Sequence, residues 1–137
     1  TLGNLGITYG SLGDHAKECD MLERTLAIEE RAYGRDHPEV ALTLNNLGSA
    51  YMDGLGEDAK ARDLFERALP IQERAYGRDH AQVALTLGNL GEAQKKLGNV
   101  AEARDHLTRA LAIEQPNDSL TSFLREQFAS LPSVVGS

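Results

Sequence analysis

The chain has 137 residues, 41% of them apolar and 26% charged, a balance that indicates a folded protein and argues against intrinsic disorder. Its formal charge of −7 comes without any cluster of Lys and Arg, so we expect no nucleic-acid partner. No apolar run approaches the roughly 18 residues that a membrane span requires, so we expect no membrane partner either.

The cysteine content and the chain start bear on where the protein works. A single cysteine, Cys19, excludes an internal disulfide and favours a reducing compartment, so we expect an intracellular, cytoplasmic protein. The chain begins Thr1-Leu2-Gly3, with neither a methionine nor a secretory signal, which suggests a piece of a longer protein.

One motif recurs along the chain. Residues 1–6 read TLGNLG, residues 43–48 read TLNNLG, and residues 86–91 read TLGNLG again. Around the last two copies, residues 24–48 and 67–91 agree at 19 of 25 positions. Such self-similarity at a fixed offset is typical of proteins built from repeated supersecondary units.

The second copy shows the plan of the unit, which begins with a helix over residues 36–52. Asp36 and Glu39 are spaced as a capping box, in which each side chain satisfies a free amide at the helix start. Apolar residues then recur every three or four positions and form one stripe: Val40, Leu44, Leu47 and Tyr51. Gly48 lies on that stripe, where its missing side chain lets a second helix approach closely.

A second helix follows a short turn at Leu55-Gly56, because a glycine there can adopt the left-handed conformation that ends a helix. It spans about Glu57 to Tyr76 and carries an apolar inner face: Ala61, Leu64, Phe65 and Ala68. Pro70 falls inside this helix, and its missing amide predicts a bend near Glu66 to Pro70. Two helices joined by so short a turn pack antiparallel.

The order of elements predicts an all-α, right-handed solenoid within a single domain, 1–137. It comprises three antiparallel helical hairpins and a C-terminal capping helix. Repeat 1 covers 1–35 with its first helix truncated, repeat 2 covers 36–78, repeat 3 covers 79–115, and the capping helix and tail cover 116–137. The capping helix carries apolar residues suited to cover repeat 3: Leu120, Phe123, Leu124, Phe128 and Leu131.

The spacing of the small and apolar residues resembles the tetratricopeptide signature. The residues that carry this resemblance are Leu47, Gly48, Tyr51, Gly56, Ala61, Phe65 and Ala68. With the stretch AYGRDHPEVALTLNNLG and a period longer than the usual ~34 residues, it resembles the long-period subclass of kinesin light chains and nephrocystin-like proteins. The resemblance implies a scaffold for protein–protein interaction.

The helix face opposite the apolar stripe is the candidate binding surface. Asn4, Asn46 and Asn89 occupy the same place in all three copies, although asparagine is a poor helix former. An amide donates and accepts hydrogen bonds and so can pair with the backbone of an extended peptide; the resemblance implies such contacts too. Alternatively, these residues bond to the neighbouring repeat and support stacking. The predicted peptide-binding residues are Asn4, Asn45, Asn46, Ser49, Met52, Asp53, Asn89, Glu92, Lys95 and Lys96.

Other activities find little support in the residues. His37 and His80 recur in equivalent turns, where capping a helix explains them better than metal binding, and His15 and His106 have no partner at ligand spacing. No phosphate-binding or nucleophile motif is present. We therefore expect no enzymatic activity, no metal and no cofactor. The carboxylate clamp of chaperone-binding members is also not expected, since only Asn46 matches it.

Taken together, these features predict a scaffold that binds an extended peptide or helical segment of a partner protein in the concave groove lined by the first helices. That segment could also belong to another part of the same polypeptide. The alternative is a structural element that self-associates by end-to-end stacking of repeats through its truncated N-terminal face.

Overall fold

The computed structural model describes residues 12–113 and 118–132. Each helix ends close to where the sequence pattern predicts, and no strand occurs within these two stretches. The elements are α2 (Leu12–Tyr33), α3 (Pro38–Ser49), the π-helical turn η1 (Ala50–Gly54), α4 (Asp58–Tyr76), α5 (Ala81–Lys96), α6 (Val100–Ala112) and α7 (Asp118–Ala129).

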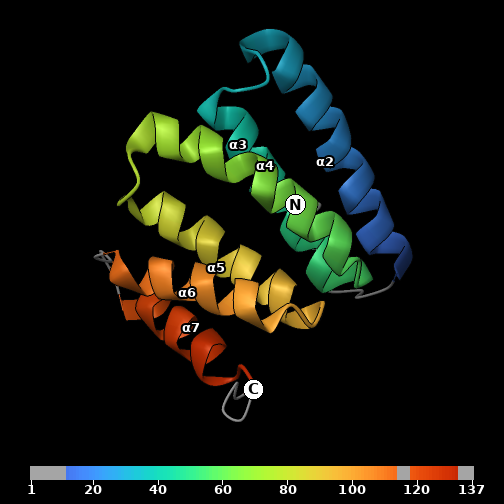
Figure 1. Cartoon of the computed structure of the whole chain (residues 1–137). Coiled ribbons are helices and arrows are strands. Elements are labelled where there is room, and N and C mark those ends of the chain that lie inside the picture. Colours follow the sequence, from blue (N-terminus) through green and yellow to red (C-terminus); the bar gives the residue numbers. More distant parts are fainter. Residues whose placement is uncertain (1–11, 114–117, 133–137) are drawn as a thin grey trace.

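The helices form an all-α solenoid, as predicted (Figure 1). The pairs α3–α4 and α5–α6 are hairpins; α4 packs on α5, α2 packs on α3, and α7 packs on both α5 and α6. Helix α2 lies at one end of the array and α7 at the other (Figure 1). The predicted first helix of repeat 1 lies outside the described residues, and the division into repeats at 1–35, 36–78 and 79–115 stays a prediction.

The helix starts correct one detail of the sequence prediction, because histidine and not Asp36 caps α3. The side-chain Nδ1 of His37 accepts a hydrogen bond of 3.1 Å from the amide of Glu39. His80 does the same for Gln82 at 3.0 Å. The proline at the first position of α3 leaves the preceding residue as the N-cap, so the cap falls one position later than a capping box at Asp36 requires.

Each hairpin closes around a glycine on its first helix. A Cβ placed on Gly48 would lie 2.6 Å from the ring of Phe65 on α4, and one on Gly91 would lie 2.6 Å from Leu107 on α6. These distances are shorter than any normal carbon contact, so only glycine lets the two helices approach this closely. The predicted role of Gly48 is therefore confirmed. The turn glycine Gly56 has the left-handed φ of 67° that was expected.

The π-helical turn η1 has a visible origin in the sequence. Tyr51 and Gly56 are five positions apart, whereas their equivalents in repeat 3, Gln94 and Gly98, are four positions apart. Repeat 2 thus contains one additional residue at the end of its first helix. The chain accommodates it as the π turn Ala50–Gly54, in which one residue is added to the helical ladder.

Repeated ion pairs join consecutive second helices. Arg67 of α4 donates to the carboxylate of Glu30 on α2, and Arg109 of α6 donates to Glu73 on α4. All four side chains are partly shielded from water, and hydrogen bonds between ionised groups are stronger than neutral ones. Because the same ion pair recurs at equivalent positions, it joins α4 to α2 in the same way as it joins α6 to α4.

The C-terminal helix covers repeat 3, as predicted. Leu124 and Leu131 are buried against Val83 and Leu87 of α5. Gly88, which occupies the place of Asn45 in repeat 2, leaves room for the side chain of Leu124, since a Cβ there would lie 2.6 Å from it. A larger residue at this position would push α7 away.

Pro70 does not interrupt α4, which continues through it to Tyr76. Pro70 is exposed, and because proline has no amide hydrogen, the helical hydrogen bond to the carbonyl of Glu66 is not made. The bend expected near this residue stays a prediction.

We expect Gly48→Ala to lower the free energy of unfolding by about 1–3 kcal/mol, because the new methyl group must displace the Phe65 ring. The loss should occur although alanine is the better helix former by about 1 kcal/mol. Urea denaturation followed by circular dichroism measures it, with exposed Thr25→Ala as the control. A stability equal to or above the wild type would contradict the close packing.

Removing a histidine cap should weaken the helix start. We expect His37→Ala to lower the free energy of unfolding by about 0.5–2 kcal/mol, because it leaves the Glu39 amide unbonded. His37→Asn keeps a side-chain acceptor and should retain most of the stability. Thermal melts of both variants test this; equal losses in the two would show that the cap bond contributes nothing.

Candidate functional site

The first helices of repeats 2 and 3 expose the same two residue types at the same places. Leu42 on α3 and Leu85 on α5 are 46% and 36% exposed, whereas Leu44 and Leu87 on the same helices are fully buried. One helical turn later come Asn46, which is exposed, and Asn89, which is half-buried. We call these four residues the groove face. Each Leu–Asn pair combines apolar contact with an amide that donates and accepts hydrogen bonds.

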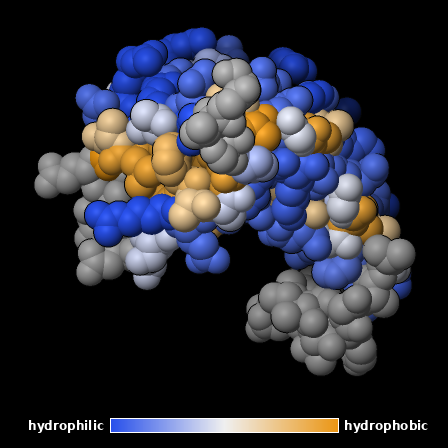
Figure 2. All heavy atoms as spheres, turned by 60° about the horizontal axis from the view of Figure 1, so that its bottom comes forward, coloured by the Kyte–Doolittle hydropathy of each residue, from blue (hydrophilic) through white to orange (hydrophobic). Residues whose placement is uncertain are grey.

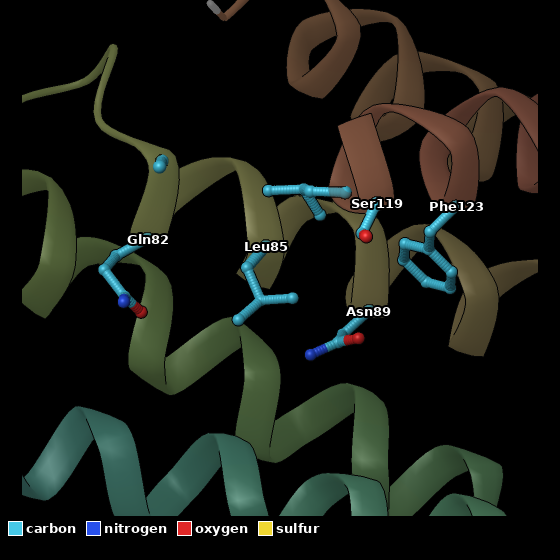
Figure 3. Close-up of a pocket in the computed structure, with 7 residues that line it drawn as sticks. Gln82, Leu85, Asn89, Ser119 and Phe123 are labelled. Atoms are coloured by element: carbon cyan, nitrogen blue, oxygen red, sulfur yellow. The ribbon is translucent and has the colours of Figure 1, made fainter. Parts of the chain in front are cut away.

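A cavity of about 520 Å³ lies between α5 and α7 and opens at this face (Figure 3). Gln82, Leu85 and Asn89 point into it from α5, and Ser119 and Phe123 face them from α7 (Figure 3). Its lining combines the apolar side chains of Leu85, Leu120 and Phe123 with the amide and hydroxyl groups of Gln82, Asn89 and Ser119. Such a lining suits one apolar side chain together with the backbone polar groups that flank it.

A second cavity, of about 430 Å³, lies between α2, α3 and η1. It is more polar than the first, and its lining residues are His15, Glu18, Leu22, Asn46, Ser49, Ala50, Asp53 and Gly54. Figure 2 shows one face of the molecule, on which a band of apolar side chains interrupts a mostly hydrophilic surface.

The predicted binding residues fall into separate environments. Asn46, Ser49 and Asp53 line the second cavity, and Asn89 lines the first. Asn4 lies outside the described residues. Lys96 pairs with two of the predicted acidic residues: its ammonium lies 3.8 Å from Asp53 of repeat 2 and 3.5 Å from Glu92 on its own helix.

Two of the predicted residues are buried, and their assignment to the binding surface is wrong. Asn45 donates a 2.8 Å hydrogen bond from Nδ2 to the hydroxyl of Thr86, which in turn donates to the side chain of Gln72. Met52 packs with Phe65 in the core. The π turn explains why Met52 is buried, because the additional residue changes the side-chain directions that α-helical spacing predicts.

Lys95 belongs to the contact with the capping helix. Its ammonium donates to the side-chain carbonyl of Gln127 at 2.6 Å and to the hydroxyl of Ser130 at 2.7 Å. Among the described residues, by contrast, nothing accepts from or donates to the side chains of Asn46 and Asn89. Within this part of the chain, the stacking role considered for the asparagines is carried out by Asn45.

Helical spacing placed Leu42 on the face opposite the apolar stripe, but the predicted binding residues included no leucine. Leu42, Leu85 and Phe123 were not among the predicted binding residues. The sequence could have predicted the two leucines, since each occurs four positions before an asparagine at an equivalent place in the repeat. The contribution of Phe123 depends on how α7 packs, which no local pattern predicts.

Burial shifts the pKa of two potentially reactive side chains in the described part of the chain. Burial raises the pKa of the Cys19 thiol, with Glu18 and Glu23 adding to the rise, so this thiol is a poor nucleophile. Burial lowers the pKa of His106 on α6. No group of three or more His, Cys, Asp or Glu side chains suited to a metal ion is found among residues 12–113 and 118–132. None of the described helices is long and apolar enough to cross a membrane.

Comparison with known families gives the same fold. The model of the family described as Tetratricopeptide repeat matches residues 1–73 and 51–115. The chain belongs to the tetratricopeptide repeat family. Members of this family are generally scaffolds for protein–protein interaction. A search of curated proteins found no match.

Solved structures of similar shape come from repeats of a Podosopora anserina kinesin light chain. One, titled putative kinesin light chain nearly identical TPR-like repeats, superposes with a TM-score of 0.76 at 23% identity. A form of the same repeats with one substitution gives 0.77 at 24% identity. Each alignment covers 92% of this chain, which spans 62% and 61% of the two solved chains. The tetratricopeptide repeats of this chain therefore have the kinesin-light-chain-like fold that the sequence predicted.

Two neighbouring asparagines on α3 should respond differently to removal of their side chains. We expect Asn45→Ala to lower the free energy of unfolding by about 1–3 kcal/mol. The substitution removes the amide that donates to the buried hydroxyl of Thr86, which itself donates to Gln72. Asn46→Ala should change it by less than about 0.5 kcal/mol. Parallel urea titrations compare the two; similar losses would contradict this division of roles.

Proposed function

We propose that the chain binds an extended peptide segment of a partner protein across the groove face on α3 and α5. The observation that supports this most is the repeated exposure of Leu42 and Leu85, each followed one turn later by Asn46 or Asn89. A solvated helix face would not need an exposed leucine at equivalent places in two repeats. The segment could come from a separate protein or from another part of the same polypeptide.

The spacing of the two helices suggests what such a peptide looks like. The hydrogen bond between Asn45 and Thr86 joins α3 to α5, so the two Leu–Asn pairs lie on neighbouring first helices. A polyproline II segment rises about 3.1 Å per residue and has three residues per turn, so every third side chain points the same way about 9 Å further on. We propose that the ligand carries apolar side chains at i and i+3, one for each Leu–Asn pair.

Charge is expected to contribute less than shape to this recognition. Asp53, Lys96 and Glu92 already pair with one another along the concave side, so the charge they present to a ligand is partly neutralised. None of the described residues that line the α5–α7 cavity is charged. We propose that the ligand is held by apolar anchors and backbone amides, without a cofactor and without catalysis.

Self-association is the second candidate function, and one observation favours it. Helix α2, at one end of the array, exposes Met21 and Ile28. Head-to-tail stacking would need an apolar face at the other end. The side chains that α7 exposes are mostly polar: Ser119, Ser122, Arg125, Glu126 and Ala129. Peptide binding is therefore the function that we put first.

A peptide selection tests the proposal. A random peptide library is selected on the wild type and on an Asn46→Ala/Asn89→Ala variant, with circular dichroism confirming equal helix content. We expect the wild type to enrich peptides with apolar residues three positions apart, and the variant to bind them at least about tenfold more weakly, since two amide pairings are lost.

A second variant, Leu42→Gln/Leu85→Gln, separates the two halves of the site. It keeps both asparagines and should lose the preference for apolar residues at i and i+3. If all three proteins enrich the same peptides, or none enriches any, the groove face is not the binding site and self-association becomes the leading function.

A further inference from the structure

The two Leu–Asn pairs of the groove face have different surroundings. Leu85 and Asn89 of α5 also line the cavity of about 520 Å³ that α7 closes on its other side. Leu42 lines neither of the two cavities described above. The described lining of the α5–α7 cavity comes from these two helices alone, so the difference between the pairs is a consequence of how α7 packs.

A glycine on α5 brings α7 up to the groove face. A Cβ on Gly88 would lie 2.6 Å from Cδ2 of Leu124 and 2.9 Å from Cε2 of Phe123, so only glycine leaves room for both side chains. In repeat 2 the same place holds Asn45, which donates to Thr86 of the next repeat. The change from asparagine to glycine therefore replaces a polar contact with an aromatic ring that lines the cavity.

Contacts elsewhere on α7 hold this ring in place. Lys95 of α5 donates to the side chain of Gln127 at 2.6 Å. The guanidinium of Arg104 on α6 lies 5.4 Å from the centre of the Phe128 ring, a cation–π contact. None of these four residues belongs to the cavity lining. The position of α7, and with it that of Phe123, is therefore set without a ligand in the cavity.

We propose that α7 is part of the ligand site and that the α5–α7 cavity receives one large apolar side chain of the bound peptide. This inference rests on the groove-face function proposed above and adds its specificity. The anchor over Leu85 and Asn89 is leucine-sized or larger, whereas the anchor over Leu42 contacts an exposed helix face and can be smaller.

The lining selects this class of side chain. Leu85, Leu120 and Phe123 supply apolar surface. The volume of about 520 Å³ falls in the range of about 300–1,000 Å³ typical of ligand pockets, so an alanine would leave most of it empty. A charged side chain would lose its hydration without gaining a counter-ion, since none of the described lining residues is charged. The side-chain amides of Gln82 and Asn89 point into the same space and can pair with the flanking peptide backbone (Figure 3).

Filling the cavity from its exposed rim tests the proposal. Ser119 lines the cavity and is exposed, so Ser119→Trp fills the space without removing a core contact. Ser122→Trp is the matched control, because Ser122 is exposed on the same helix and does not line the cavity. Peptides that the wild type enriches from the random library are titrated with both variants and followed by fluorescence anisotropy, with thermal melts confirming equal folding. We expect at least about tenfold weaker binding to Ser119→Trp, because the burial of one large apolar side chain is lost, and unchanged binding to Ser122→Trp.

Changes in the peptide identify the anchor. In each enriched peptide the two apolar residues are replaced by alanine, one at a time. One replacement should weaken binding to the wild type at least about tenfold and have no further effect on Ser119→Trp, because this variant has already lost that contact. The other replacement should weaken binding by the same factor in both proteins. Lysine at the first position should bind the wild type no better than alanine.

The failure of this inference and that of the proposed function give different results. If Ser119→Trp binds the enriched peptides as tightly as the wild type, or if both tryptophan variants weaken binding equally, the cavity holds no anchor and the inference is wrong, while the groove-face proposal stands. If the wild type enriches no peptide, or the Asn46→Ala/Asn89→Ala variant binds the same peptides equally well, the proposed function fails and this inference fails with it.

Discussion

No helix hairpin in this chain buries enough apolar surface by itself, so each depends on its neighbours for cover, and this dependence organises the rest of the structure. Helix α4 is covered twice. Ala68 and Ile71 are packed against its own partner α3, whereas Phe65 reaches Leu90 and Ala93 of the next repeat. A buried chain of hydrogen bonds, from Asn45 through Thr86 to Gln72, follows the same contact. At the C-terminal end of the array, α7 covers α5 and α6.

The groove is a consequence of the same packing. A first helix such as α3 or α5 uses most of its circumference to contact its partner and the neighbouring repeats. The remaining face is the one that carries Leu42 with Asn46 and Leu85 with Asn89. Because the repeats are related by a regular arrangement, these pairs come into line without any specific contact between them. In the function proposed above, a surface formed in advance by the packing of the repeats would reduce the entropy lost on binding.

Local sequence patterns were sufficient to predict many features and misleading for others. The turn at Gly56, the close contact at Gly48 and the capping helix at residues 118–129 all follow from short-range patterns that tertiary packing reinforces. The helix cap at His37 was assigned one residue too early, because Pro38 fixes where the helix can begin. Met52 was assigned to the wrong face, because the pattern assumes α-helical spacing through a segment where the chain forms a π turn.

The sequence by itself determined the helices, their pairing into hairpins, the repeat and the membership of an interaction family, because each depends on residue spacing within one unit or between copies. The tertiary structure alone decided which polar residues of the first helices remain available. Asn45 and Asn46 are adjacent and chemically identical, yet one is buried against Thr86 and the other is exposed. Lys95 and Lys96 differ in the same way, since only the first contacts α7. These choices depend on the angle and distance at which one repeat meets the next, a relation between elements that no single helix encodes.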